Sequence, residues 1–179
     1  WKLFCKHYKR WLRKNHHSTN VRRNIKAENT EKRYSALILT HNAALQLYLA
    51  LTSWNVRNTT YILFWKKKST LDECIIKSKY YDIIAGSLLL AYADTEFNHL
   101  GREYLLKERI EKANYDVILI DTPPSLGLLN IMSLTASTKI IIPTECSYLA
   151  MIGLDQLSNT IESVRKHSNK ELEIAGILL

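Results

Sequence analysis

The sequence predicts an α/β fold, a doubly wound parallel β-sheet of which this chain forms a part. Short apolar runs of strand length alternate along the chain with amphipathic stretches of helical spacing. One of these runs, residues 116–121, is apolar throughout between two aspartates, which is typical of a strand covered on both faces. The intervening segments are long enough for helical crossovers, so the strands can form right-handed βαβ units.

The predicted elements begin near residue 70. Residues 81–85 form an apolar run closed by Gly86, which predicts a strand. Residues 102–113 place apolar side chains at helical spacing, with Glu108 and Lys112 as an i,i+4 pair, and predict an amphipathic helix. Residues 116–121 are the strand described above.

The second half of the chain continues this alternation. The predicted elements are a buried helix at 127–136, a β-branched strand at 139–143, a helix at 153–167 with Leu154, Leu157, Ile161 and Val164 on one face, and a strand at 173–179. Because the sequence stops after an apolar strand with no covering helix, we expect the fold to be C-terminally truncated.

Length and composition favour one globular domain and exclude several classes. The 179 residues are 46% hydrophobic and 23% charged, close to the averages of soluble proteins. Neither a membrane span nor a secretory signal is predicted. The three cysteines, Cys5, Cys74 and Cys146, are widely spaced, which argues against a disulfide framework or a four-ligand zinc site and favours a reducing cytoplasm.

The positive charge is confined to the start of the chain. Residues 1–34 carry 11 Lys/Arg against 2 Glu, a net charge of +9, whereas residues 35–179 have a net charge of −1. The first 71 residues also contain no Gly, Pro or Asp, and all four Trp occur by Trp65. Turns there lack their usual residues. Two interpretations of this segment remain open. It is either a basic DNA-binding arm or a stretch translated out of its natural reading frame.

The most informative run is VILIDTPPSLGLL, residues 117–129. A buried strand there would deliver Asp121 to the carboxyl edge of the sheet, where open α/β proteins bind ligands and where a carboxylate can hold magnesium through its water shell. Pro123 and Pro124 fix φ in the following loop and stiffen it, so that the loop can respond to what occupies the site. The alternative is that Asp121 only caps the next helix.

This run and the segments around it, including YYDIIAGSLLLAYADTEF and KIIIPTECSYLAMIGLDQL, resemble the ParA/Soj-type partition ATPases of the MinD group of deviant P-loop proteins. The resemblance covers roughly residues 70–179. It implies a SIMIBI/MinD-like fold, ATP and Mg²⁺ as cofactors, a homodimer, nonspecific DNA binding and a ParB-type partner. It makes Asp121 the Walker B aspartate and metal-binding residue. Thr122, Pro123, Pro124 and Ser125 become the nucleotide-sensing loop, and Cys146 a small buried residue.

The resemblance also implies motifs that this chain lacks. A K-G-G-x-G-K-T-T phosphate loop and a D-x-D-P-Q motif should precede residue 70, but the first glycine is Gly86, so Lys14 is no phosphate-loop lysine. Shifted by one base, plausible codons for residues 9–17 read K-G-G-x-G-K-T-T, and shifted by two bases, residues 39–42 read Asp-Pro-Gln. The adenine-rich codons of residues 66–68 are a plausible site for the second shift.

We therefore interpret residues 1–69 as a basic, out-of-frame or degenerate segment and residues 70–179 as a partial ATPase domain. The chain as written is expected to be inactive, and His16 and His17 need no metal. The alternatives are a noncatalytic DNA- or partner-binding protein that uses the basic arm, and a MinD-like membrane-associated ATPase.

Overall fold

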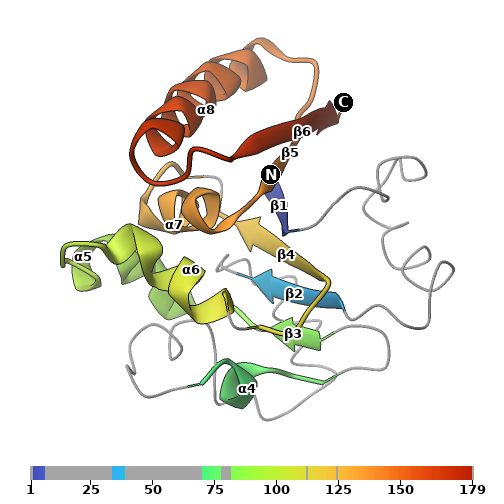
Figure 1. Cartoon of the computed structure of the whole chain (residues 1–179). Coiled ribbons are helices and arrows are strands. Elements are labelled where there is room, and N and C mark those ends of the chain that lie inside the picture. Colours follow the sequence, from blue (N-terminus) through green and yellow to red (C-terminus); the bar gives the residue numbers. More distant parts are fainter. Residues whose placement is uncertain are drawn as a thin grey trace, which may run out of the picture.

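The computed structural model describes residues 2–6, 34–38, 70–77, 82–111, 113–123 and 125–178 (Figure 1). Their centre is a six-stranded sheet with the strand order β3-β2-β4-β1-β5-β6. The strands are β1 Lys2–Lys6, β2 Tyr34–Ile38, β3 Asp82–Ile84, β4 Val117–Thr122, β5 Lys139–Pro143 and β6 Glu173–Leu178. The strands expected near residues 81–85, 116–121, 139–143 and 173–179 are all present.

Five of the six strands point the same way. Strand β2 pairs in parallel with both β3 and β4, and β5 pairs in parallel with β6. The predicted α/β class with a parallel sheet is thus confirmed, with one correction: β1 runs antiparallel to both of its neighbours, β4 and β5. Without β1, the facing edges of β4 and β5 would leave backbone N–H and C=O groups unpaired. A short strand of either direction can form hydrogen bonds with these groups.

The helices confirm the predicted order but differ in their ends. They are α4 Leu71–Cys74, the 3₁₀ helix η2 Leu88–Tyr92, α5 Ala93–Glu96, the 3₁₀ helix η3 Arg102–Tyr104, α6 Leu105–Ile110, α7 Leu128–Ala136 and α8 Tyr148–His167. The helix expected at residues 102–113 is a 3₁₀ turn followed by α6, and Lys112 lies outside the described residues. Helix α8 begins five residues earlier than expected, because Ser147 caps it by accepting from the Ala150 N–H at 3.2 Å.

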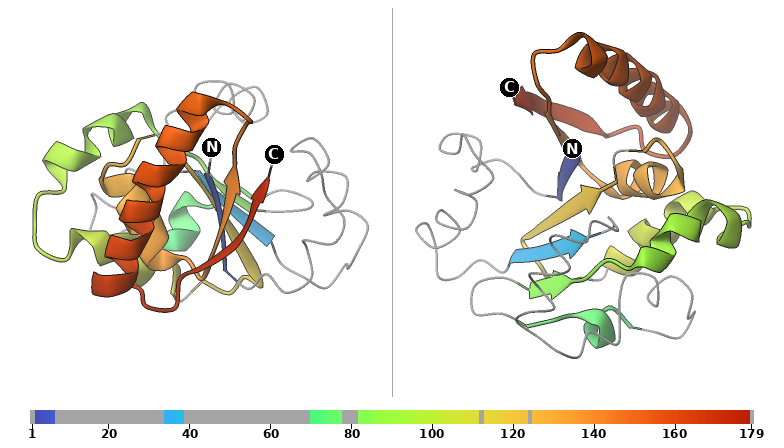
Figure 2. Two further views of the ribbon diagram at one scale, coloured as in Figure 1. Left: turned by 90° about the horizontal axis from the view of Figure 1, so that it is seen from above. Right: turned by 180° about the vertical axis from the view of Figure 1, so that it is seen from behind.

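The core lies between the sheet and the helices α6, α7 and α8, which gather on one side of it (Figure 2). Leu106, Met132 and Ile140 are completely buried there. Along β4, Ile118 and Ile120 join this core, whereas Val117 and Leu119 pack with Ile141 in a second cluster. Because side chains alternate along a strand, Thr122 falls on the helix-covered face and Asp121 on the opposite one. No helix in the described ranges is long and apolar enough to cross a membrane.

Candidate functional site at the carboxyl end of β4

Asp121 is the penultimate residue of β4 and lies at the carboxyl edge of the sheet. In register it is level with Ile38, the last residue of β2, and with Leu3 near the start of β1. Burial raises the pKa of its carboxyl above the ordinary value, because desolvation penalises the charged form. None of the ion pairs between described residues includes Asp121. It is therefore a half-buried carboxylate that a cation would stabilise.

The loop after Asp121 starts inside the protein and ends at its surface. Thr122 is only 2% exposed and Pro123 is buried, whereas Ser125 is exposed. Pro124, also predicted to belong to the site, lies outside the described residues. The Thr122 hydroxyl has no hydrogen-bond partner within the described ranges, and a buried unpaired hydroxyl costs about 1–3 kcal/mol. The four described residues of the predicted site, which are close neighbours in the sequence, thus run from the carboxyl edge of the sheet out to the surface.

Asn130, in the first turn of α7, holds this loop in place. Its side chain is completely buried. Its Nδ2 donates to the Pro123 carbonyl at 3.1 Å and also to the Ser125 carbonyl. Its Oδ1 has no partner among the described residues. The sequence analysis missed Asn130, although a polar side chain inside the apolar run LLNIMSL was a usable signal.

Helix α7 receives its N-terminal cap from a distant residue. Its N-cap position is Gly127, which has no side chain to offer. Instead, the Leu128 N–H donates to Asp94 Oδ1 at 2.7 Å, and Asp94 belongs to α5. A Cβ atom on Gly127 would lie 2.6 Å from Asp94 Oδ2, so glycine is needed for this close approach. The alternative that Asp121 caps the helix is therefore wrong, and Asp94 is a second residue that the sequence analysis missed.

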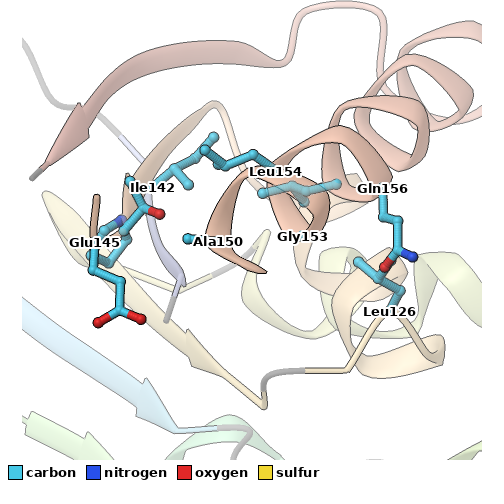
Figure 3. A pocket seen from close by; sticks show the side chains of 10 residues that line it. Leu126, Ile142, Glu145, Ala150, Gly153, Leu154 and Gln156 are labelled. Carbon is cyan, nitrogen blue, oxygen red and sulfur yellow. The ribbon is translucent and has the colours of Figure 1, made fainter. Parts of the chain in front are cut away.

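Two grooves flank the loop, and Leu126 lines both. One, of about 460 Å³, lies between the end of β5 and the first turns of α8, with Ile142, Glu145 and Leu154 among its lining residues (Figure 3). The other, of about 530 Å³, lies among α5, α7 and α8 and includes Asp94. Because Leu126 follows the loop directly, the position of the loop affects one lining residue of each groove.

The donor set around Asp121 suits a magnesium ion that takes most of its ligands from elsewhere. No group of three or more His, Cys, Asp or Glu side chains that could hold a metal occurs in the described part of the chain. Mg²⁺ keeps several waters and is commonly held by one or two carboxylates together with substrate phosphates. A single half-buried carboxylate fits that mode of binding and does not fit an all-protein metal site.

The expectation for Cys146 is wrong. The residue is exposed, because it lies in the loop between β5 and the Ser147 cap of α8 rather than on either element. Cys74 is buried, and burial raises the pKa of its thiol, as expected for an unreactive core cysteine. Lys14, His16, His17 and residues 39–42 and 66–68 lie outside the described residues.

Comparisons with known proteins agree on one family. The AAA-domain family matches residues 22–174. The chain is 50% identical over 101 residues to the sporulation initiation inhibitor protein Soj of Bacillus subtilis, covering 55% of this chain and 40% of Soj. It is 39% identical over 104 residues to the chromosome partitioning protein ParA of Myxococcus xanthus, covering 56% of this chain and 37% of that protein. The chain thus spans about two fifths of the length of these relatives.

A solved structure has a similar fold. Cobyrinic acid a,c-diamide synthase from Mycobacterium smegmatis, with bound ADP and magnesium, superposes with a TM-score of 0.73 at 26% identity. The match covers 82% of this chain and 61% of the synthase chain.

Proposed function

Because this chain belongs to the AAA-domain family and is of the ParA/Soj type, we propose that it corresponds to part of a cytoplasmic partition ATPase with its nucleotide site at the carboxyl end of β4. The observation that carries this proposal is Asp121, a half-buried carboxylate at the sheet edge, followed by a loop clamped to α7. In the intact protein, ATP would drive homodimerisation and nonspecific DNA binding, and a ParB-type protein would be the partner.

The chemistry of the site supports magnesium and nucleotide rather than a metal alone. When bound, Mg²⁺ would neutralise part of the charge of the nucleotide phosphates. Asp121 would hold that ion directly or through water, because a cation would offset the cost of burying its charge. Thr122, Pro123, Pro124 and Ser125 would form the loop that responds to the nucleotide. The bound ADP and magnesium in the structural relative support this choice of cofactors.

We propose further that the chain as written does not hydrolyse ATP. No glycine occurs among residues 1–85, so no glycine-rich loop there can point backbone N–H groups at phosphate. We attribute this to residues 1–69 being out of frame or degenerate, with the ATPase domain at 70–179. The position of β2 supports this: it ends at Ile38, level with Asp121, directly before the residues 39–42 whose shifted frame reads Asp-Pro-Gln.

A second candidate function is noncatalytic DNA binding through the basic start of the chain. The net charge of +9 on residues 1–34 favours it, because clustered Lys and Arg bind phosphate backbones without sequence preference. In that case the unaltered chain would bind DNA without ATP. The ATPase proposal requires instead that DNA binding depends on nucleotide.

The deciding experiment compares the chain as written with a frame-restored, full-length version. Two single-base insertions would explain the two shifted readings described above. Restoration removes one base between about codons 18 and 39 and another between about codons 43 and 70, which recovers both motifs. We expect Mg²⁺-dependent ATP binding, dimerisation and salt-sensitive DNA binding only after restoration. In the restored protein, Asp121→Ala should weaken Mg²⁺-dependent nucleotide binding, whereas Asp155→Ala, an exposed carboxylate of α8, should leave it unchanged.

Two outcomes contradict the proposal. ATP turnover by the unrestored chain would mean that its first residues do form a phosphate site. Unchanged nucleotide affinity and magnesium dependence in restored Asp121→Ala would mean that Asp121 takes no part in the site.

A further inference from the structure

The loop after Asp121 depends on another element for its hydrogen bonds. Proline has no N–H group, so Pro123 and Pro124 can donate to no carbonyl in the loop. Two of the loop carbonyls, those of Pro123 and Ser125, instead accept from the single amide nitrogen of Asn130. An asparagine amide carries two N–H donors, and these two carbonyls use both. The loop is therefore held from α7 rather than by itself.

Asn130 is not placed there for ordinary packing. It is completely buried in a helix whose other buried side chains are mostly apolar, and its Oδ1 remains without a partner among the described residues. One residue before Pro123, the Thr122 hydroxyl is also buried without a partner among the described residues. One group is an unused acceptor and the other an unused donor. An apolar side chain at position 130 would avoid this cost, so the amide must serve the loop.

The loop in turn positions Leu126, which lines both grooves. Beyond Leu126, the cap from Asp94 to the Leu128 N–H fixes the start of α7. The segment from Asp121 to Leu128 is thus attached at two places, through Asn130 and through Asp94. Of these two contacts, the one through Asn130 acts on the residues next to Asp121.

We propose that Asn130 is a positioning residue, whose amide fixes the loop after Asp121, and with it Leu126, on the amino end of α7. The meaning of this position for nucleotide sensing rests on the proposed function; the positioning itself does not. Movement of the loop would require both amide contacts to break, so the loop and α7 move together.

The chain offers a matched control at the other end of α7. Asn169 is also an asparagine whose Nδ2 donates to two carbonyls, those of Leu134 at 2.8 Å and Ser137 at 2.6 Å. Its contacts are far along the helix from the loop. A threonine at either position keeps one donor and removes the other, so Asn130→Thr and Asn169→Thr are the same chemical change at two places.

The test is amide hydrogen exchange on the full chain, read at Leu128 and Ile131, whose N–H groups donate to Asp94 Oδ1 and to the Gly127 carbonyl next to the loop. We expect Asn130→Thr to speed exchange at these two amides about tenfold, as the loss of one hydrogen bond predicts, while β4 and the second half of α7 stay near wild-type rates. Asn169→Thr should leave these two amides unchanged. No acceleration in Asn130→Thr, or equal acceleration in both variants, would overturn the positioning role.

A second measurement separates this inference from the proposed function. In the frame-restored, full-length protein, ATP binding in the presence of Mn²⁺ should weaken in Asn130→Thr and not in Asn169→Thr. Faster exchange next to the loop together with no Mn²⁺-dependent ATP binding by the restored wild type would support the role of Asn130 and count against the nucleotide site at Asp121. Mn²⁺-dependent ATP binding together with unchanged exchange in Asn130→Thr would overturn the role of Asn130 and leave the nucleotide site standing.

Discussion

The cap that Asp94 provides for α7 predicts a strong energetic coupling between Asp94 and Gly127. Asp94→Ala removes the 2.7 Å hydrogen bond from the Leu128 N–H. Loss of an N-cap side chain costs about 1 kcal/mol, and loss of a negative charge at a helix amino end adds roughly 0.3–1 kcal/mol. We therefore expect this substitution to lower the free energy of unfolding by about 1–2 kcal/mol.

Gly127→Ala should cost about the same by a different route. Its φ of −73° is acceptable for alanine, so no backbone strain is expected. The new Cβ would instead lie 2.6 Å from Asp94 Oδ2 and 3.2 Å from Oδ1, which forces the carboxylate away from the Leu128 N–H. Once Asp94 is alanine this clash no longer exists. The double variant should then be about as stable as Asp94→Ala alone, a coupling of about 1 kcal/mol.

Urea denaturation followed by far-ultraviolet circular dichroism measures these free energies. Gly153→Ala is the control, because Gly153 lies within α8 with nothing within 4 Å of its Cβ position. It should stabilise the protein by about 0.5–1 kcal/mol with either residue at position 94. If the effects of Asp94→Ala and Gly127→Ala add to within about 0.5 kcal/mol, the trans-cap explanation is refuted.

Two further predictions concern residues of the site. Because burial raises the pKa of Asp121, the native state binds the proton of this carboxyl more tightly than the unfolded state does. The stability that comes from the protonated carboxyl is lost as the pH rises above 3.8, the ordinary pKa of an aspartate, and through the raised pKa of the native state. In thermal melts, Asp121→Asn should be more stable than wild type at pH 7 without added cation and as stable as wild type near pH 3. Equal stability of the two proteins at both pH values would contradict this prediction. Thr122→Val keeps the shape of a 2%-exposed side chain and removes an unpaired hydroxyl. It should raise the free energy of unfolding by about 1 kcal/mol in the urea assay, and a loss of stability would mean that the hydroxyl has a stabilising partner.

The sequence was sufficient to predict four of the six strands, β3 to β6, and the buried helix α7, because their signals are local; β1 and β2 were not predicted. The apolar runs that became β4 and β5 have no competing helical periodicity, and residues 128–136 are mostly apolar. The start of α8 was missed because its first turns expose large apolar side chains. Tyr148 and Leu149 are 72% and 78% exposed, which hides the one-sided pattern, and only Ser147 signalled the true beginning.

The candidate site could be predicted only in part. Asp121 and the loop after it were found because a strand ending in aspartate and two prolines is visible in the sequence. The role of Asp94 could not be found, since it lies 34 residues before Leu128 and meets it only through the packing of α5 against α7. The direction of β1 was likewise unpredictable, because a five-residue strand between two open edges carries no signal for its polarity.

The reversed direction of β1 has a mechanical consequence. Lys2, at its amino end, lies level with Thr122, and Leu178, at the carboxyl end of β6, lies level with Pro143. Both attachment points are therefore at the same edge of the sheet, and a force applied between them acts across the strands rather than along them. Among the described strands, β6 is at the edge of the sheet and pairs with β5 alone, so in an optical trap it should peel away from β5 one hydrogen-bonded pair after another. Handles placed at residues 2 and 178 should therefore record gradual unzipping at low force rather than one abrupt rupture by shear.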